Sequence, residues 1–123
     1  MILQDQIRSA IGTHAMWKGR LRSAIETGKS EFTPETVRRD DCCEFGNWLH
    51  EVTTPALRSS ECYRNCLDKH RRFHETAARV ITLAVAGQAE NAKREIGVNS
   101  AFAKASAELT EAMMDWSEHA ARP

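Results

Sequence analysis

Apolar side chains recur every three or four residues along the first part of the chain. The series consists of Leu3, Ile7, Ala10, Trp17, Leu21 and Ala24. This spacing is that of one face of an α-helix, so it predicts a helix over residues 2–27 that ends at Gly28, a residue suited to a left-handed cap. His14 fills the gap between Ile7 and Leu21, which places a histidine on the buried face of this helix.

Two further long segments carry the same helical period. In residues 59–86 the repeating positions are Leu67, His70, His74, Ala77, Ile81 and Ala84, and Gly87 follows the segment. In residues 89–119 the repeating positions are Phe102, Ala105, Leu109, Ala112 and Trp116. The pattern predicts one long helix in each segment, with a kink at Gly97 in the second. Two more histidines therefore lie on a buried helix face.

The segment between the first two long helices, residues 29–54, is more broken. Thr33 followed by Pro34 is typical of a helix start, with the proline in the first turn. Asp41 with Glu44 three residues later indicates another helix start. We therefore expect short helices in this part of the chain.

The second of these short helices carries a cysteine at its beginning. We expect Cys43 to lie in its first turn, among unpaired N–H groups at the positive end of the helix dipole. Such a location lowers the pKa of a thiol and favours the thiolate. Cys43 is therefore a candidate reactive or metal-binding sulfur.

The composition also favours helices. The 123 residues include three prolines and six glycines, and clusters of β-branched or aromatic residues are scarce. The sequence predicts an all-α fold, an antiparallel four-helix bundle with one extra short helix that carries Cys43. A chain of this length has room for one domain, which we expect to span residues 1–123.

Charge and hydropathy exclude several function classes. Seventeen basic residues balance seventeen acidic ones, so the surplus of positive charge that binds nucleic acid or anionic lipid is lacking. Uncharged runs such as 80–88 and 96–103 are far shorter than the roughly 20 residues of a spanning helix. The four cysteines do not form a disulfide framework, and no secretion signal opens the chain. We expect a cytoplasmic protein with no membrane or nucleic-acid partner.

The three buried histidines require partners. Each imidazole buried without one costs about 1–3 kcal/mol, and a single metal ion satisfies all three. His70 and His74 lie one helical turn apart and reach the same ion, while His14 and Cys43 complete four ligands. Three nitrogens and one sulfur suit tetrahedral Zn²⁺, although copper accepts the same ligands. Calcium and magnesium are disfavoured because the set contains no carboxylate.

Three motifs carry a family resemblance. Residues 14–21, HAMWKGRL, resemble the H-x-x-W-K-x-x-L opening of the chemoreceptor zinc-binding domain family. Residues 43–49, CEFGNWL, resemble its C-x-F-G-x-W-L signature, and residues 70–74, HRRFH, resemble its H-x-x-F-H. The order and spacing of the motifs also match, and the resemblance covers about residues 5–118. The three motifs together indicate this family specifically, whereas any one of them alone is weak evidence for it.

The resemblance implies a helical bundle with zinc held by His14, Cys43, His70 and His74. Domains of this family are typically attached to bacterial chemoreceptors or diguanylate cyclases and act as cytoplasmic sensors of zinc or of oxidants such as hypochlorous acid. It therefore implies a non-enzymatic sensor that controls chemotaxis or cyclic-di-GMP signalling through an output partner or a fused output domain. Members with cyclase output form homodimers. This chain shows no output domain, and its thiols Cys42, Cys62 and Cys66 are not part of the family pattern.

Exposed apolar residues would allow self-association. Met113, Met114 and Trp116 are candidates for a homodimer interface, although the same residues are equally suited to the core. The sequence leaves the two roles open.

Other metal sites and activities are less well supported. Cys62, Cys66, His70 and His74 follow one another at steps of four, but such a row drifts by about 120° around a helix, too far for one ion. A di-iron site needs a glutamate three before or four after a histidine, and no histidine has one. A hydrolytic zinc enzyme or a cysteine nucleophile remains an alternative. His50 and His119 are expected to be exposed.

Cys43 is the one ligand that an oxidant can alter. Its conversion to sulfenic acid would weaken metal binding and release the short helix, which is the signal we expect. The alternative is a purely structural zinc in a protein-interaction module.

Overall fold

The computed structural model describes the whole chain except residues 1, 41–42, 52–54, 56–58 and 122–123. Every regular element in the described residues is a helix, and none is a strand. The helices are α1 (Ile2–Ala15), α2 (Trp17–Thr27), α3 (Pro34–Arg38), α4 (Glu44–Glu51), α6 (Glu61–Val85), α7 (Ala89–Glu95) and α8 (Ala101–Ala121). The predicted all-α fold is therefore confirmed.

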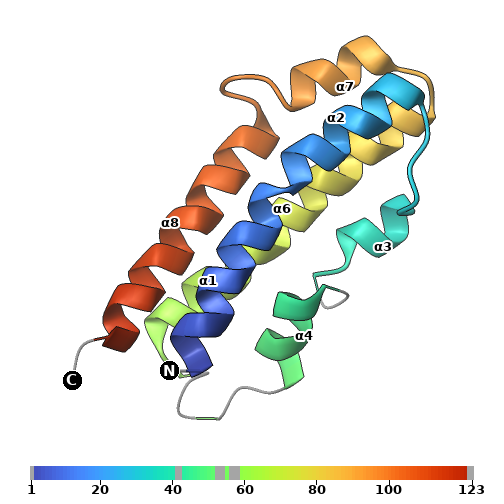
Figure 1. The fold of residues 1–123 in the computed structure, drawn as a ribbon. Helices are drawn as coiled ribbons and strands as arrows, with labels where there is room; N and C mark the ends of the chain where they lie inside the picture. Colours follow the sequence, from blue (N-terminus) through green and yellow to red (C-terminus); the bar gives the residue numbers. More distant parts are fainter. Residues whose placement is uncertain (1, 41–42, 52–54, 56–58, 122–123) are drawn as a thin grey trace.

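The helices form a bundle whose arms run alternately up and down (Figure 1). α1 and α2 follow one another to the far end, and the chain returns through α3 and α4. α6 then runs the full length again, and α8 returns beside α1 and α6. The predicted antiparallel four-helix bundle is thus confirmed, with one arm made of two short helices. α7 closes the end at which α2 and α6 finish.

The predicted first helix is divided into α1 and α2 by a single residue. Met16 keeps helical backbone angles, but its N–H donates to the Thr13 carbonyl, three residues back, at 3.2 Å. The buried face continues across this turn, since Ile7 and Leu21 are fully buried. Gly28 ends α2 at φ +71°, so the predicted left-handed cap is confirmed.

The predicted helix start at Thr33 is also confirmed. Its side-chain oxygen accepts a hydrogen bond from the backbone N–H of Thr36 at 3.2 Å, and Pro34 occupies the first turn of α3. The other predicted start, at Asp41, lies outside the described residues. In the described residues, α4 begins directly after Cys43.

α6 is the central helix of the bundle. Ser60 caps its start by accepting from the Tyr63 N–H, and Gly87 follows its end at φ +78°. Its buried positions include most of the predicted series and also the intervening Phe73. Apolar side chains therefore surround the two histidines of this helix on the inner side of the bundle.

The prediction of one helix over residues 89–119 is wrong, because the chain breaks completely where a kink at Gly97 was expected. α7 ends at Glu95, and Asn99 adopts a left-handed conformation with φ +66°. Ser100 then caps α8 by accepting from the Ala103 N–H at 3.1 Å. The buried series predicted for this segment is nevertheless confirmed within α8.

Of the apolar residues considered for an interface, Met113 and Trp116 belong to the core, whereas Met114 is 53% exposed. None of the helices in the described residues has the length and apolar character needed to cross a bilayer.

Candidate metal centre

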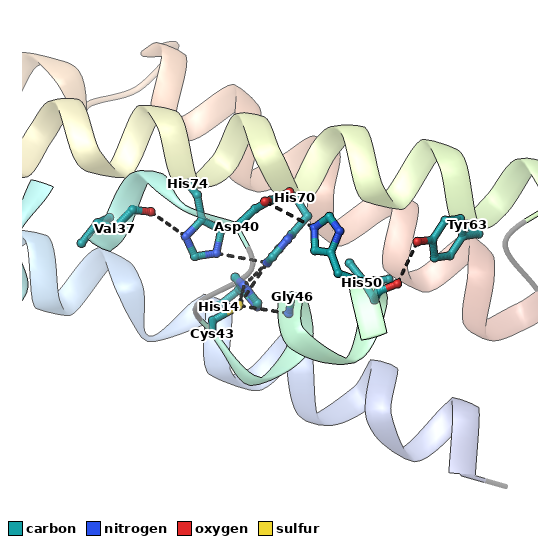
Figure 2. A network of polar contacts seen from close by, with 10 residues as sticks. His14, Val37, Asp40, Cys43, Gly46, His50, Tyr63, His70 and His74 are labelled. Carbon is teal, nitrogen blue, oxygen red and sulfur yellow. Dashed lines mark hydrogen bonds and ion pairs between the residues drawn. The ribbon is translucent and has the colours of Figure 1, made fainter. Parts of the chain in front are cut away.

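Four side chains from separate parts of the chain point at one spot inside the bundle (Figure 2). His14 comes from the end of α1, Cys43 precedes α4, and His70 and His74 come from α6. One ligand atom from each, a ring nitrogen or the sulfur, lies within 4.8 Å of all the others. The structure thus brings together all four residues that the sequence singled out.

The distances between these atoms match one tetrahedral ion. The Nε2 atom of His70 lies 3.1 Å from that of His14 and 3.0 Å from that of His74. The Sγ atom of Cys43 lies 3.3 Å from the Nε2 of His70 and 3.9 Å from that of His14. Ligands around one zinc ion are separated by about 3.3 Å for two nitrogens and about 3.6 Å for nitrogen and sulfur, given ordinary bond lengths.

Backbone carbonyls fix the orientation of two rings. The Nδ1 atom of His14 lies 2.7 Å from the carbonyl oxygen of Ala10, and that of His74 lies 2.9 Å from the carbonyl oxygen of Val37. A carbonyl only accepts hydrogen bonds, so each Nδ1 carries the proton and donates it. The Nε2 atoms of both neutral rings then present lone pairs to the centre. This arrangement is the usual support for a metal-bound histidine.

The third ring, that of His70, cannot donate a hydrogen bond to both of these lone pairs. His70 faces both Nε2 lone pairs, and as a neutral ring it has a single proton to offer. Its Nδ1 atom is the buried side-chain nitrogen for which the described residues supply no hydrogen-bond partner. His70 can therefore donate to only one of the two lone pairs, and the thiol of Cys43 offers the other no more than a long contact, since its sulfur lies 3.9 Å from the Nε2 of His14. A cation bound by the three Nε2 atoms and the sulfur removes this imbalance, so the residues present fit a metal ion.

Burial keeps the imidazoles neutral. Desolvation lowers the pKa of His14 to about 4 and that of His70 to about 2, and it also lowers the pKa of His74. Desolvation is the largest cause of these shifts, and the neighbouring imidazoles contribute to those of His14 and His70. Near neutral pH all three rings are therefore in the form that binds a metal.

Cys43 occupies the N-cap of α4 rather than its first turn. Its carbonyl accepts from the Asn47 N–H at 2.9 Å, and its sulfur accepts from the Gly46 N–H at 3.3 Å. The prediction of a lowered thiol pKa is wrong for the protein without metal. Burial raises the pKa of Cys43, and the backbone N–H donors, which lower it, have the smaller effect.

Gly46 allows the loop before α4 to pack closely against that helix. A Cβ atom at this position would lie 1.5 Å from the carbonyl oxygen of Asp40 and 3.0 Å from the Cε1 atom of His70. Any side chain here would therefore push the loop or the imidazole away. Glycine is required at position 46 because the backbone of Asp40 approaches so closely, and not because α4 needs a left-handed conformation there.

Further contacts hold α4 in place. The hydroxyl of Tyr63 on α6 donates to the Leu49 carbonyl at 2.8 Å, and His50 lies 3.4 Å from the Asp40 carboxylate (Figure 2). The indole of Trp48 packs against that of Trp116 on α8, with ring centroids 5.7 Å apart. The helix that follows the sulfur ligand is thus tied to both α6 and α8.

The remaining cysteines and histidines lie outside the cluster, as predicted for those that the structure describes. Cys66 is buried on α6, where burial raises its pKa to about 12, and Cys62 is half-buried one turn earlier. His50 and His119 are exposed. The expectation for Cys42 concerns a residue outside the described part of the chain.

Sequence reasoning missed the supporting groups. The carbonyls of Ala10 and Val37 are backbone atoms, and no side-chain pattern indicates them. The backbone carbonyl of Asp40 lies close to the cluster through the tight packing at Gly46, which likewise produces no pattern in the spacing of residues.

A comparison with models of known protein families shows which family the chain belongs to. The model of the chemoreceptor zinc-binding domain matches residues 14–81, more than half of the chain and all four clustered residues. The chain belongs to the chemoreceptor zinc-binding domain family. No curated protein and no solved structure matches it. The matched region ends within α6, so α7 and α8 lie beyond it.

We predict that Gly46→Ala weakens the metal centre of this zinc-binding domain. Alanine normally favours a helix by up to about 1 kcal/mol over glycine, but the contact with Asp40 should reverse the sign and cost about 2 kcal/mol or more. Urea unfolding and zinc titration measure the two effects. Gly19→Ala is the matched control, because a Cβ there meets open space. Equal behaviour of the two variants would contradict the packing argument.

The histidine pKa values predict how the metal-free domain responds to acid. The folded-state pKa values lie below the ordinary 6.5, so the unfolded chain takes up more protons as the pH falls below about 6.5. Stability is therefore full above that pH and falls towards pH 4, by on the order of 3 kcal/mol for His14 alone. Urea unfolding of the metal-free chain across this range measures the loss. A flat profile in the wild type would refute the prediction.

Proposed function

We propose that the chain is a zinc-dependent sensory domain in which Cys43 reports oxidants or zinc level to an output partner. The observation that carries this proposal is the unequal exposure of the ligands. The three histidines are at most 6% exposed, whereas Cys43 is only partly buried. The ligand that an oxidant can alter is therefore also the most accessible one.

The donor set supports zinc as the metal. Three imidazole nitrogens and one thiolate are typical tetrahedral zinc ligands, and family membership points to the same ion. His14, Cys43, His70 and His74 would hold it. Zinc bound here would stabilise the thiolate of Cys43 and supply no redox chemistry of its own.

The sensing step takes place on sulfur. The Cys43 thiolate gives two electrons to an oxidant such as hypochlorous acid, gains the hydroxyl oxygen as sulfenic acid, and chloride leaves. The product has lost the negative charge that makes the thiolate a strong ligand. It also accepts less well from the Gly46 N–H, so the N-cap of α4 weakens with the metal site.

Release of α4 would transmit the signal. This helix contacts α8 through Trp48 and Trp116, so its movement changes the packing of an element outside the metal centre. The output partner would be of the chemoreceptor or diguanylate cyclase type, acting in the bacterial cytoplasm on chemotaxis or cyclic-di-GMP. A homodimer belongs to the same proposal. We propose no catalytic step, since four protein ligands leave zinc no open position.

A purely structural zinc is the second candidate. The cluster joins three segments of the bundle, so metal binding contributes folding energy in either case. The two functions differ in what happens when the metal leaves. A sensor keeps its fold and rebinds zinc, whereas a structural site unfolds.

Zinc content tests the ligand set. We expect one equivalent in the purified wild type and well below one in Cys43→Ala and His70→Ala, measured by metal analysis after dialysis. Cys62→Ala and His119→Ala are the matched controls and should keep the full equivalent. Full retention of zinc by both ligand variants would contradict the assignment.

Oxidation tests the sensor. Stoichiometric hypochlorous acid should release zinc from the wild type, with helical circular dichroism largely kept, and a reductant should restore binding. Zinc release and Cys43 sulfenic acid are measured together by a chromogenic chelator and by mass spectrometry. Irreversible unfolding on zinc loss would favour the structural role instead.

A further inference from the structure

Two hollows lie next to each other on one face of the bundle, and we call the two together the groove. The larger, of about 690 Å³, lies between the end of α1 and α8. The smaller, of about 370 Å³, lies between α2 and the α7–α8 connection. Lys18 and Ile96 line both hollows, so the groove follows α1 and α2 past the beginning of α8.

The floor of this groove is formed by short or apolar side chains. Ala15, Ala103 and Ala107 line the larger hollow together with the buried Phe102. Large apolar side chains are exposed towards both ends, with Met114 53% and Val98 93% exposed. A partner's apolar residues laid along the groove would cover both of these side chains.

The two ends of the groove carry opposite charge. The α8 wall presents three exposed carboxylates, at Glu111, Asp115 and Glu118. The other hollow is lined by the basic side chains of Arg22 and Lys93 and by one carboxylate, Glu26, while Lys18 lies where the two hollows meet. Within the part of the chain that the structure describes, none of the three carboxylates makes an ion pair. Glu118 also stands in the last turn of α8, where the helix dipole disfavours negative charge.

We propose that this groove binds an amphipathic helix of the output partner, with an apolar stripe on the floor and basic residues beside Glu111, Asp115 and Glu118. A concave surface is filled by a convex helix, whereas a second copy of the chain would present the same concave face. Basic side chains on the partner would supply the charges that the α8 carboxylates lack within the described residues. The inference rests on the proposed function, for which it defines the chemistry of the partner.

The groove also borders the metal centre. His14 contributes to the wall of the larger hollow while its Nε2 atom faces the other ligands. A change in the position of this ring therefore alters the docking surface directly. The partner helix and the metal would share one structural element, α1.

The test uses the zinc-loaded full chain and a labelled synthetic helix as long as α8, with leucine at every third and fourth position and lysine beside this stripe. Fluorescence anisotropy measures its binding. We expect micromolar affinity, weakened about tenfold or more by Ala107→Trp and by the double substitution Glu111→Lys, Glu118→Lys. Ala101→Trp and Glu108→Lys, exposed positions of α8 outside the groove, are the matched controls. A peptide with the same residues in scrambled order should not bind.

Three results would overturn the inference. The first is that the helical peptide does not bind, and the second is that groove and control variants bind it with equal affinity. The third is that the wild type sediments as a dimer in the analytical ultracentrifuge and Ala107→Trp as a monomer, because the groove would then hold a second copy of the chain. Zinc content is measured on the same samples. Loss of zinc counts against the proposed metal site, whereas any of the three results in fully zinc-loaded protein counts against the groove alone.

Discussion

The surplus of lone pairs at the centre of the bundle is the constraint on which the site depends. Two imidazoles are committed by backbone carbonyls to point unprotonated nitrogens inward, and the third has too few protons to satisfy them. A well-packed domain does not bury such a group without a partner, because each unmatched polar atom costs about 1–3 kcal/mol. A positive ion is the partner that accepts every lone pair at once.

The broken arm of the bundle gives this centre its fourth ligand. A continuous helix in place of α3 and α4 would present only side chains along its length, whereas the interruption places a sulfur at a helix start, where backbone N–H groups also reach it. The close approach at Gly46 fixes the interruption against α6. A buried set of histidines is thus combined with one partly exposed ligand at the start of a short helix, and the proposed sensing role depends on this arrangement.

Much of this could be predicted from the sequence, for identifiable reasons. The period of apolar residues fixes which faces are buried, so the position of His14 on the seam of α1 and of His70 and His74 on that of α6 followed directly. The break between α7 and α8 did not, because the left-handed turn at Asn99 and the cap at Ser100 compete with a continuous helical period. The pKa of Cys43 was mistaken because its burial depends on tertiary packing, which outweighs the local helix dipole. The carbonyls that orient the rings belong to the backbone and are invisible to side-chain patterns.

X-ray absorption at the zinc edge of the reconstituted protein tests the central claim most directly. The account predicts a first shell of three nitrogens at about 2.0 Å and one sulfur at about 2.3 Å, with the imidazole signature in the outer shell. The sulfur contribution should vanish in Cys43→Ser. A shell of oxygen atoms alone, or one with two sulfurs, would contradict it.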